Sequence, residues 1–150
     1  MPLDNFDDRS IPWRRFGDFT PPFHYFILNI DEKQRIADVL FKLPAHQQIV
    51  LHRHLALNHT FVVQGEHRLY ETDGSLREIR PSGSYTVSPA SETPHREGGG
   101  AQDVIIHFSI RPGHDEALYE ILDDALNPVA VINFSTLVEL YKTQETPLAG

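Results

Sequence analysis

The sequence contains no cysteine among its 150 residues. It can therefore form neither a disulfide nor a thiolate metal site, so any metal ion must be bound through nitrogen and oxygen atoms. The chain also lacks a run of roughly 18 apolar residues, and residues 1–10 are acidic where a signal peptide would be basic. We therefore expect a soluble, cytoplasmic protein with no membrane partner.

Positive charge is scarce as well, because the formal net charge is -8 at pH 7. A surface that binds nucleic acid needs a basic face, so we expect no nucleic-acid partner and a small molecule instead. The length fits one domain over residues 1–150, and a 40% apolar composition is enough for one core.

Apolar and polar residues alternate in short segments that end at Pro, Gly or Asp-Gly, which is the pattern of β-strands. The Asp73-Gly74 pair predicts a hairpin turn, because Gly adopts a positive φ without steric cost. The pattern predicts strands over residues 23–30, 36–43, 48–54, 59–64, 66–71, 75–79, 84–88 and 103–110. The expected fold class is all-β, a sandwich or a barrel.

Residues 1–22 contain four prolines beside Trp13, Phe16 and Phe19. Disordered segments are poor in aromatic residues, so we expect an extended arm that packs on the strands.

Residues 114–133 allow two interpretations. One is an amphipathic helix over residues 114–126. The other, which we favour, is a hairpin of strands 118–122 and 129–133, because residues 129–132 are a β-type run and Asn127-Pro128 is a turn signal. A short helix over about residues 135–143 would follow, started by Ser135 and carrying Leu137, Val138 and Tyr141 on one face.

Residues 50–66, VLHRHLALNHTFVVQGE, contain the pair His52 and His54. In a strand, residues two apart face the same way, so both imidazoles point to one side and can share a metal ion. A solvated strand face with paired histidines is the alternative.

The spacing around this pair resembles the first motif of the cupin superfamily. That motif runs Gly, five residues, His-x-His, three or four residues, Glu, six residues, Gly. Here His46 stands at the first Gly, Asn58 stands at the Glu, and Gly65 stands at the last Gly. Asn58 could be a weak oxygen ligand, or it could hydrogen-bond a water molecule.

The second cupin motif is Gly, five residues, Pro-x-Gly, two residues, His, three residues, Asn. This chain has Gly83 and Pro89 at the matching positions, His95 one place late, and Gly99 at the Asn. The resemblance covers residues 44 to 110 and implies an RmlC-like jelly-roll barrel over about residues 23–133, with His95 brought beside His52 and His54 as a third ligand. A surface loop histidine is the alternative for His95.

Among cupins, the three-histidine pattern and the C-terminal layout are similar to the acetylacetone-cleaving and dihydroxyacetophenone dioxygenases. This resemblance implies ferrous iron on His52, His54 and His95. It also implies a β-dicarbonyl or hydroxyketone that chelates as its enolate and is cleaved at a carbon-carbon bond. Zinc, nickel or manganese would also accept three imidazoles. With no carboxylate among the ligands, the site should favour an anionic, oxygen-chelating substrate.

Other polar residues are weaker candidates for a role at the metal site. Glu97 could be a general base or could orient a neighbour, although a solvated loop carboxylate is the commoner outcome, and the run EGGG at residues 97–100 predicts a flexible turn. His107 could reach the interior, whereas His59 should face away from His52 and His54.

Assembly and activity stay open. Ile49 and Leu51 are expected on the outer side of their strand, where the arm or a second subunit would cover them, and because cupins are commonly dimers the resemblance implies a homodimer. The alternative to a dioxygenase is a non-catalytic metal-binding, ligand-binding or sensor cupin, because a fold does not define an activity.

Overall fold

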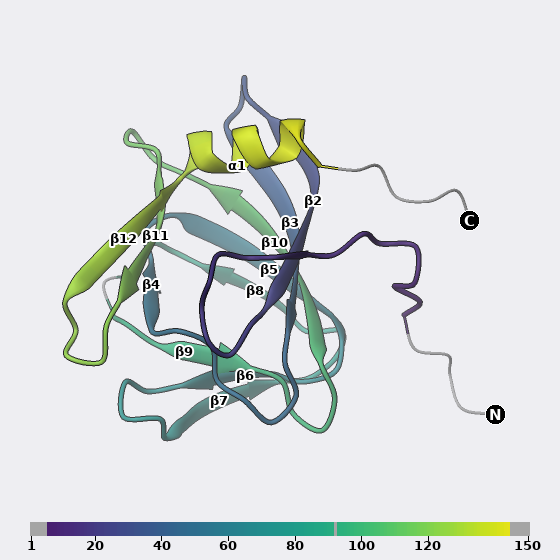
Figure 1. The fold of residues 1–150 in the computed structure, drawn as a ribbon, viewed down its shortest axis with the longest axis vertical. Helices are drawn as coiled ribbons and strands as arrows, with labels where there is room; N and C mark the ends of the chain where they lie inside the picture. The colour runs from purple at the N-terminus through teal and green to yellow at the C-terminus, as the bar shows by residue number, and fades with distance from the viewer. Residues whose placement is uncertain (1–5, 92, 145–150) are drawn as a thin grey trace.

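The structure is a computed structural model that describes residues 6–91 and 93–144 (Figure 1). It is mostly β with one short C-terminal helix, as predicted. The elements are β1 (Arg14–Arg15), β2 (His24–Asp31), β3 (Ile36–Leu43), β4 (His52–His54), β5 (Leu57–Gln64), β6 (His67–Tyr70), β7 (Leu76–Arg80), β8 (Tyr85–Ser88), β9 (Arg96–Gly98), β10 (Val104–Arg111), β11 (Ala117–Leu122), β12 (Pro128–Asn133) and α1 (Phe134–Lys142).

The strands form three antiparallel sheets. One sheet has the order β1-β2-β3-β10-β5-β8, the second has the order β12-β11-β4, and the third has the order β7-β6-β9. Several neighbours are distant in sequence, such as β3 beside β10 and β4 beside β11 (Figure 1). These long-range pairings bring together the segments that carry the histidines. Closure of all strands into one jelly-roll barrel stays a prediction.

The hydrophobic core takes one face of each long strand, because alternate residues of a strand point the same way. Val39 on β3, Ile106 on β10 and Leu118 on β11 are fully buried in it. An aromatic group fills one end, where the rings of Phe16 and Phe23 lie 5.4 Å apart. Burial of these large rings is the main local contribution to stability.

The described part of the N-terminal segment, residues 6–22, contacts the sheets. Phe16 is buried in the core. Asp8 accepts hydrogen bonds from Lys42 Nζ on β3 at 2.6 Å and from Trp13 Nε1 at 2.9 Å. Residues 1–5 of the expected arm lie outside the described residues.

The C-terminal interpretation as a hairpin and a helix is confirmed, and the helix over residues 114–126 is wrong. β11 and β12 pair in an antiparallel ladder. The helix begins at Phe134, with Asn133 as N-cap, so the prediction of Ser135 as the start is wrong by one residue. Ser135 instead donates a hydrogen bond to Glu116 at 2.6 Å. Leu137 and Val138 are buried as expected.

Two further details correct the sequence-based elements. Tyr141 does not share the buried face of the helix, because 36% of it is exposed. The strand predicted over residues 48–54 is formed only at His52–His54. Ile49 therefore does not follow the strand alternation, and it lines the same cavity as His52 instead of facing outward. Leu51 is also buried.

The remaining predicted strands agree with the structure to within two residues at each end. Among the described residues, no helix is long and apolar enough to cross a membrane.

Candidate metal centre

β4 places His52 and His54 side by side on the inner face of the protein. Both side chains are buried. His52 donates from Nδ1 to the carbonyl oxygen of Val50 at 2.8 Å, which fixes the orientation of its ring. This contact turns Nε2 of His52 toward the interior, the arrangement that metal-binding histidines commonly show.

His95 reaches the same place through the backbone. It forms a bridge with His52, in which each backbone N–H donates to the carbonyl oxygen of the other residue, at 2.8 and 3.1 Å. The imidazole ring of His95 lies 4.7 Å from the ring of His52 and 4.8 Å from that of His54, centre to centre. The three histidines of the two cupin-like motifs therefore meet.

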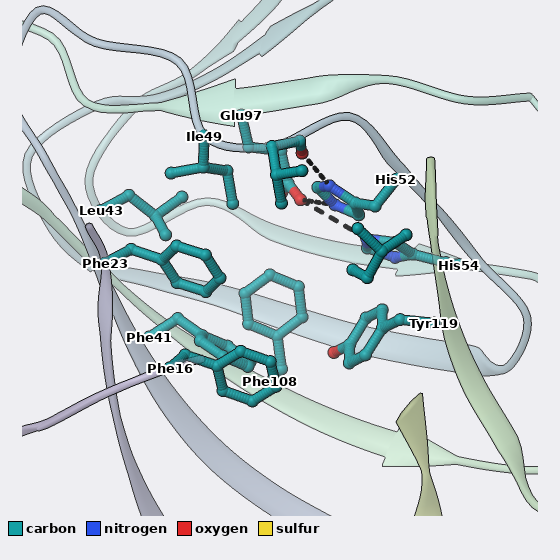
Figure 2. Close-up of a pocket in the computed structure, with 12 residues that line it drawn as sticks. Phe16, Phe23, Phe41, Leu43, Ile49, His52, His54, Glu97, Phe108 and Tyr119 are labelled. Atoms are coloured by element: carbon teal, nitrogen blue, oxygen red, sulfur yellow. Dashed lines mark hydrogen bonds and ion pairs between the residues drawn. The ribbon is translucent and has the colours of Figure 1, made fainter. Parts of the chain in front are cut away.

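Glu97 is the fourth member of the cluster. It lies on β9, two residues after His95, and is only 3% exposed. Its Oε2 lies 2.6 Å from His52 Nε2, 3.5 Å from His54 Nε2 and 3.4 Å from His95 Nε2 (Figure 2 draws the contacts with His52 and His54). The interpretation of a site without a carboxylate is therefore wrong, as is that of Glu97 as a solvated loop residue.

The glycines after Glu97 explain this error. Residues 97–98 are not a flexible turn but part of β9, because residues 44–49 run alongside this strand. Ile49 N–H donates to the carbonyl oxygen of Glu97 at 2.8 Å. A Cβ on Gly98 would lie 1.8 Å from the carbonyl oxygen of Gln47, so only glycine permits this approach. The close packing turns an apparent loop carboxylate into a buried one.

His67 contacts the other oxygen of Glu97. β6 pairs with β9 so that Leu69 lies opposite Glu97, which places His67 as its diagonal neighbour on the same face. His67 is 1% exposed, and its Nε2 donates to Glu97 Oε1 at 2.5 Å. Sequence reasoning missed His67. Because His67 and Leu69 are two residues apart in a strand, the sequence indicates that His67 faces inward. This pattern does not distinguish a histidine of the metal site from one that only packs in the core.

Burial and the Glu97 carboxylate set the ionisation states of the cluster. Burial acts to lower the pKa of His52, but the hydrogen bond to Glu97 outweighs burial and leaves this pKa raised. Burial lowers the pKa of His54 to about 4 and also lowers that of His95, so both imidazoles are neutral at pH 7. Burial acts to raise the pKa of Glu97, but its contacts with the surrounding histidines, first of all the hydrogen bond with His52, outweigh burial and leave this pKa well below its ordinary value.

The residues fit a divalent metal ion. One ligand atom from each of His52, His54, His95 and Glu97 lies within 4.8 Å of all the others. Nε2 of His54 and of His95 are buried and have no hydrogen-bond partner within the described residues. His52 Nε2 and Glu97 Oε2 lie 2.6 Å apart, so a cation bound by both groups would take the place of the proton that they share. Three imidazoles and one carboxylate form a common donor set for transition metals.

Three other residues considered for the site, Asn58, His107 and His59, do not belong to this cluster of ligand atoms. Asn58 is fully buried and donates to the carbonyl oxygen of Ala56 at 3.0 Å, with its amide 3.4 Å from His54 Nδ1. His107 contacts Asp38 at 3.0 Å, away from the cluster. His59 contacts the Tyr85 hydroxyl at 2.5 Å, on the opposite side of its strand from Asn58, as expected.

A small apolar cavity opens onto the cluster (Figure 2). Its volume is about 40 Å³. Its polar side chains are those of His52, His54, Glu97 and Tyr119. Its apolar walls are Phe16, Phe23, Phe41, Leu43, Ile49, Val50, Phe108 and Ile121. The cavity is therefore apolar except at the end nearest the histidines, where the oxygen atoms of a ligand would lie.

No family model matches the sequence, and no curated protein matches it. Solved structures do match. An RmlC-like cupin protein from Ralstonia eutropha has 24% identity and a TM-score of 0.69, and the match covers 88% of this chain and 80% of that one. An acetylacetone dioxygenase from Acinetobacter johnsonii has 13% identity and a TM-score of 0.68, with coverages of 97% and 93%.

A DMSP lyase from Ruegeria pomeroyi is more distant, with 20% identity, a TM-score of 0.52 and coverages of 68% and 56%. At these identities the likeness establishes the fold alone. The chain has the cupin fold, with a possible metal site at His52, His54, His95 and Glu97. The fold that the cupin resemblance implies is thereby confirmed.

Proposed function

We propose that the protein is a ferrous-iron dioxygenase that cleaves a carbon-carbon bond in a small β-dicarbonyl or hydroxyketone. The observation that carries this proposal is the aromatic cavity that opens directly onto the buried cluster of three histidines and Glu97. A substrate in this cavity would have its oxygen atoms beside the ligand atoms and its hydrocarbon part against phenylalanine rings.

The charge of the ligand set supports an enolate as the bound form. Neutral imidazoles and one ionised carboxylate leave a divalent ion with a single positive charge, and a chelating enolate carries one negative charge. When bound, ferrous iron would supply coordination positions for substrate and dioxygen and would relay electrons from the substrate to dioxygen.

The protein side chains bind and orient. His52, His54, His95 and Glu97 would hold the ion. The walls at Phe23 and Phe108 would exclude water from the reacting end of the substrate, which strengthens the electrostatic interactions there. Holding both reactants beside the ion would lower the entropic part of the barrier.

Fold similarity supports the proposal only as an analogy. An acetylacetone dioxygenase shares the fold over almost the whole chain, but a DMSP lyase shares it too. Substrate chemistry must therefore be tested directly.

The test is metal analysis followed by oxygen uptake. We expect near-stoichiometric metal in protein purified without chelator, and loss of that metal in His52→Ala and His95→Ala. His59→Ala is the matched control, because His59 contacts Tyr85 and not the cluster. Protein reloaded with iron, but not with zinc, nickel or manganese, should consume oxygen in the presence of acetylacetone.

Two outcomes would contradict the proposal. Metal that does not bind even after reloading would remove the catalytic ion. Tight binding of acetylacetone by iron-loaded protein without oxygen uptake would identify a non-catalytic ligand-binding cupin instead.

A further inference from the structure

Tyr119 is a polar residue of the apolar cavity that does not belong to the metal cluster. We propose that its hydroxyl donates the hydrogen bond that binds one oxygen atom of the small carbonyl compound in this cavity. The inference deepens the proposed function, and it rests on that proposal for the class of ligand.

Strand pairing places Tyr119 beside the cluster. β11 is antiparallel to β4, with Tyr119 directly opposite His54 and Ile121 opposite His52. Residues opposite each other in a ladder project from the same face, so Tyr119 faces the cavity together with the histidines. The ring of Tyr119 lies 5.1 Å from the ring of His54 and 6.3 Å from that of His52.

The hydroxyl of Tyr119 has no partner in the described part of the chain. Tyr119 is 7% exposed, and its oxygen atom is buried without a hydrogen bond. Buried hydroxyl groups are nearly always hydrogen-bonded, because an unpaired donor loses its contact with water and gains nothing in return. Figure 2 shows this hydroxyl pointing toward the aromatic side chains that line the cavity.

The other unpaired buried atoms differ from this one. Nε2 of His54 and of His95 belong to the cluster that would hold a metal ion. Asn58 and His67 do not line the apolar cavity. Among the described residues that line this cavity, the Tyr119 hydroxyl is thus the unpaired donor that a ligand can use.

The chemistry of the surroundings defines the acceptor. A phenol donates one hydrogen, and the aromatic walls around it favour an uncharged or charge-delocalised group over a localised ion. A carbonyl or enolate oxygen has two lone pairs, so it can contact a metal ion with one and accept from Tyr119 with the other. The expected ligand is a short-chain 1,3-dicarbonyl compound.

The experiment compares wild-type protein with Tyr119→Phe, which keeps the ring and removes only the hydroxyl. Both are loaded with zinc, and the binding of acetylacetone is measured by calorimetry in the absence of oxygen. We expect the variant to bind about tenfold to a hundredfold more weakly, the range for a hydrogen bond to a charged acceptor. Tyr141→Phe is the control, because Tyr141 lies exposed on α1.

Thermal unfolding of ligand-free protein is the second measurement. We expect the melting temperature of Tyr119→Phe to be equal to or above that of the wild type, because the hydroxyl has no structural partner to lose. A lowered melting temperature would count against the inference.

Equal affinity in wild type and Tyr119→Phe would overturn the inference and leave the dioxygenase proposal standing. Failure of wild-type protein to bind acetylacetone would also overturn it, whatever the oxygen assay shows. Conversely, absence of oxygen uptake by the iron form overturns the proposed function alone, because the zinc experiment measures binding and not turnover.

Discussion

Glu97 uses its two carboxylate oxygens for different purposes. Oε1 accepts from His67, and Oε2 faces the three histidines. With one oxygen occupied, Glu97 would bind a metal ion through the other oxygen alone. A residue that hydrogen-bonds a metal-binding side chain, as His67 does Glu97, holds that side chain in place before the metal ion binds. It therefore raises metal affinity without contacting the ion.

We therefore predict that His67→Ala weakens zinc binding by about 10- to 100-fold, measured by competition with a chelating dye. His67→Gln should recover part of the loss, because its amide can still donate to Glu97. His107→Ala serves as control, since His107 contacts Asp38 and not the cluster. Unchanged affinity in His67→Ala would show that Glu97 is held by other contacts.

At this scale the sequence predicts part of the site. Strand alternation places His52 and His54 on one face, and the cupin resemblance adds His95, one place away from the position that the motif gives. Glu97 was misassigned because its burial comes from a distant segment packing on Gly98, which no local pattern encodes. His46 stands at a glycine position of the motif and has a φ of 58°, so the motif reflects a backbone requirement that His46 meets with strain.

Among the elements, β9 controls the position of Glu97. It has three residues and pairs with β6 on one side, and residues 44–49 lie against the other side. Any residue larger than glycine at position 98 would therefore disrupt this packing.

We predict that Gly98→Ala lowers the free energy of unfolding by at least about 2 kcal/mol in urea denaturation and also weakens metal binding. The reason is the 1.8 Å approach of a new Cβ to the carbonyl oxygen of Gln47. Gly113→Ala is the matched control, because nothing lies within 4 Å of a Cβ there. If both variants unfold alike, β9 is not packed as described.

Long strands can be predicted from the sequence, whereas short strands cannot. Long strands such as Ile36–Leu43 were predicted well, because their alternation extends over many residues. β1 and β9 were missed, and β4 was drawn too long, because such short strands exist only through pairing with distant segments. Asn133 is the N-cap of the helix but makes no side-chain hydrogen bond, so the capping signal at Ser135 lies two residues too late.

For the whole molecule, the N-terminal segment is attached partly through a half-buried ionic contact, that of Asp8 with Lys42. Burial of Asp8 acts to raise its pKa, but hydrogen bonds from Lys42 and Trp13 outweigh burial and leave the pKa below its ordinary value of 3.8. A lowered folded-state pKa means that the ionised form stabilises the fold above the ordinary pKa. That stabilisation disappears as the pH falls through the folded-state value.

We predict that Asp8→Asn is less stable than wild type by about 1 kcal/mol at pH 7, and that the difference vanishes under strongly acidic conditions. Urea denaturation at both pH values measures it. Asp18→Asn is the control, because Asp18 is an exposed carboxylate on the same segment. A difference independent of pH would contradict the ionic origin of the effect.

The homodimer and the cytoplasmic location stay predictions, because both depend on the resemblance and on composition. Analytical ultracentrifugation would test the first, with a mass of twice 17.1 kDa expected.

The pairing of β4 with β11 also has a consequence for the order of events during synthesis. A growing chain that has emerged as far as Gly100 already contains His52, His54, His95 and Glu97, but it lacks the strand that pairs with His52 and His54. Contacts between residues so far apart in sequence form late, because a long loop must close first. Metal capture would therefore follow synthesis of the C-terminal hairpin, and the ion would lock a finished fold instead of nucleating it.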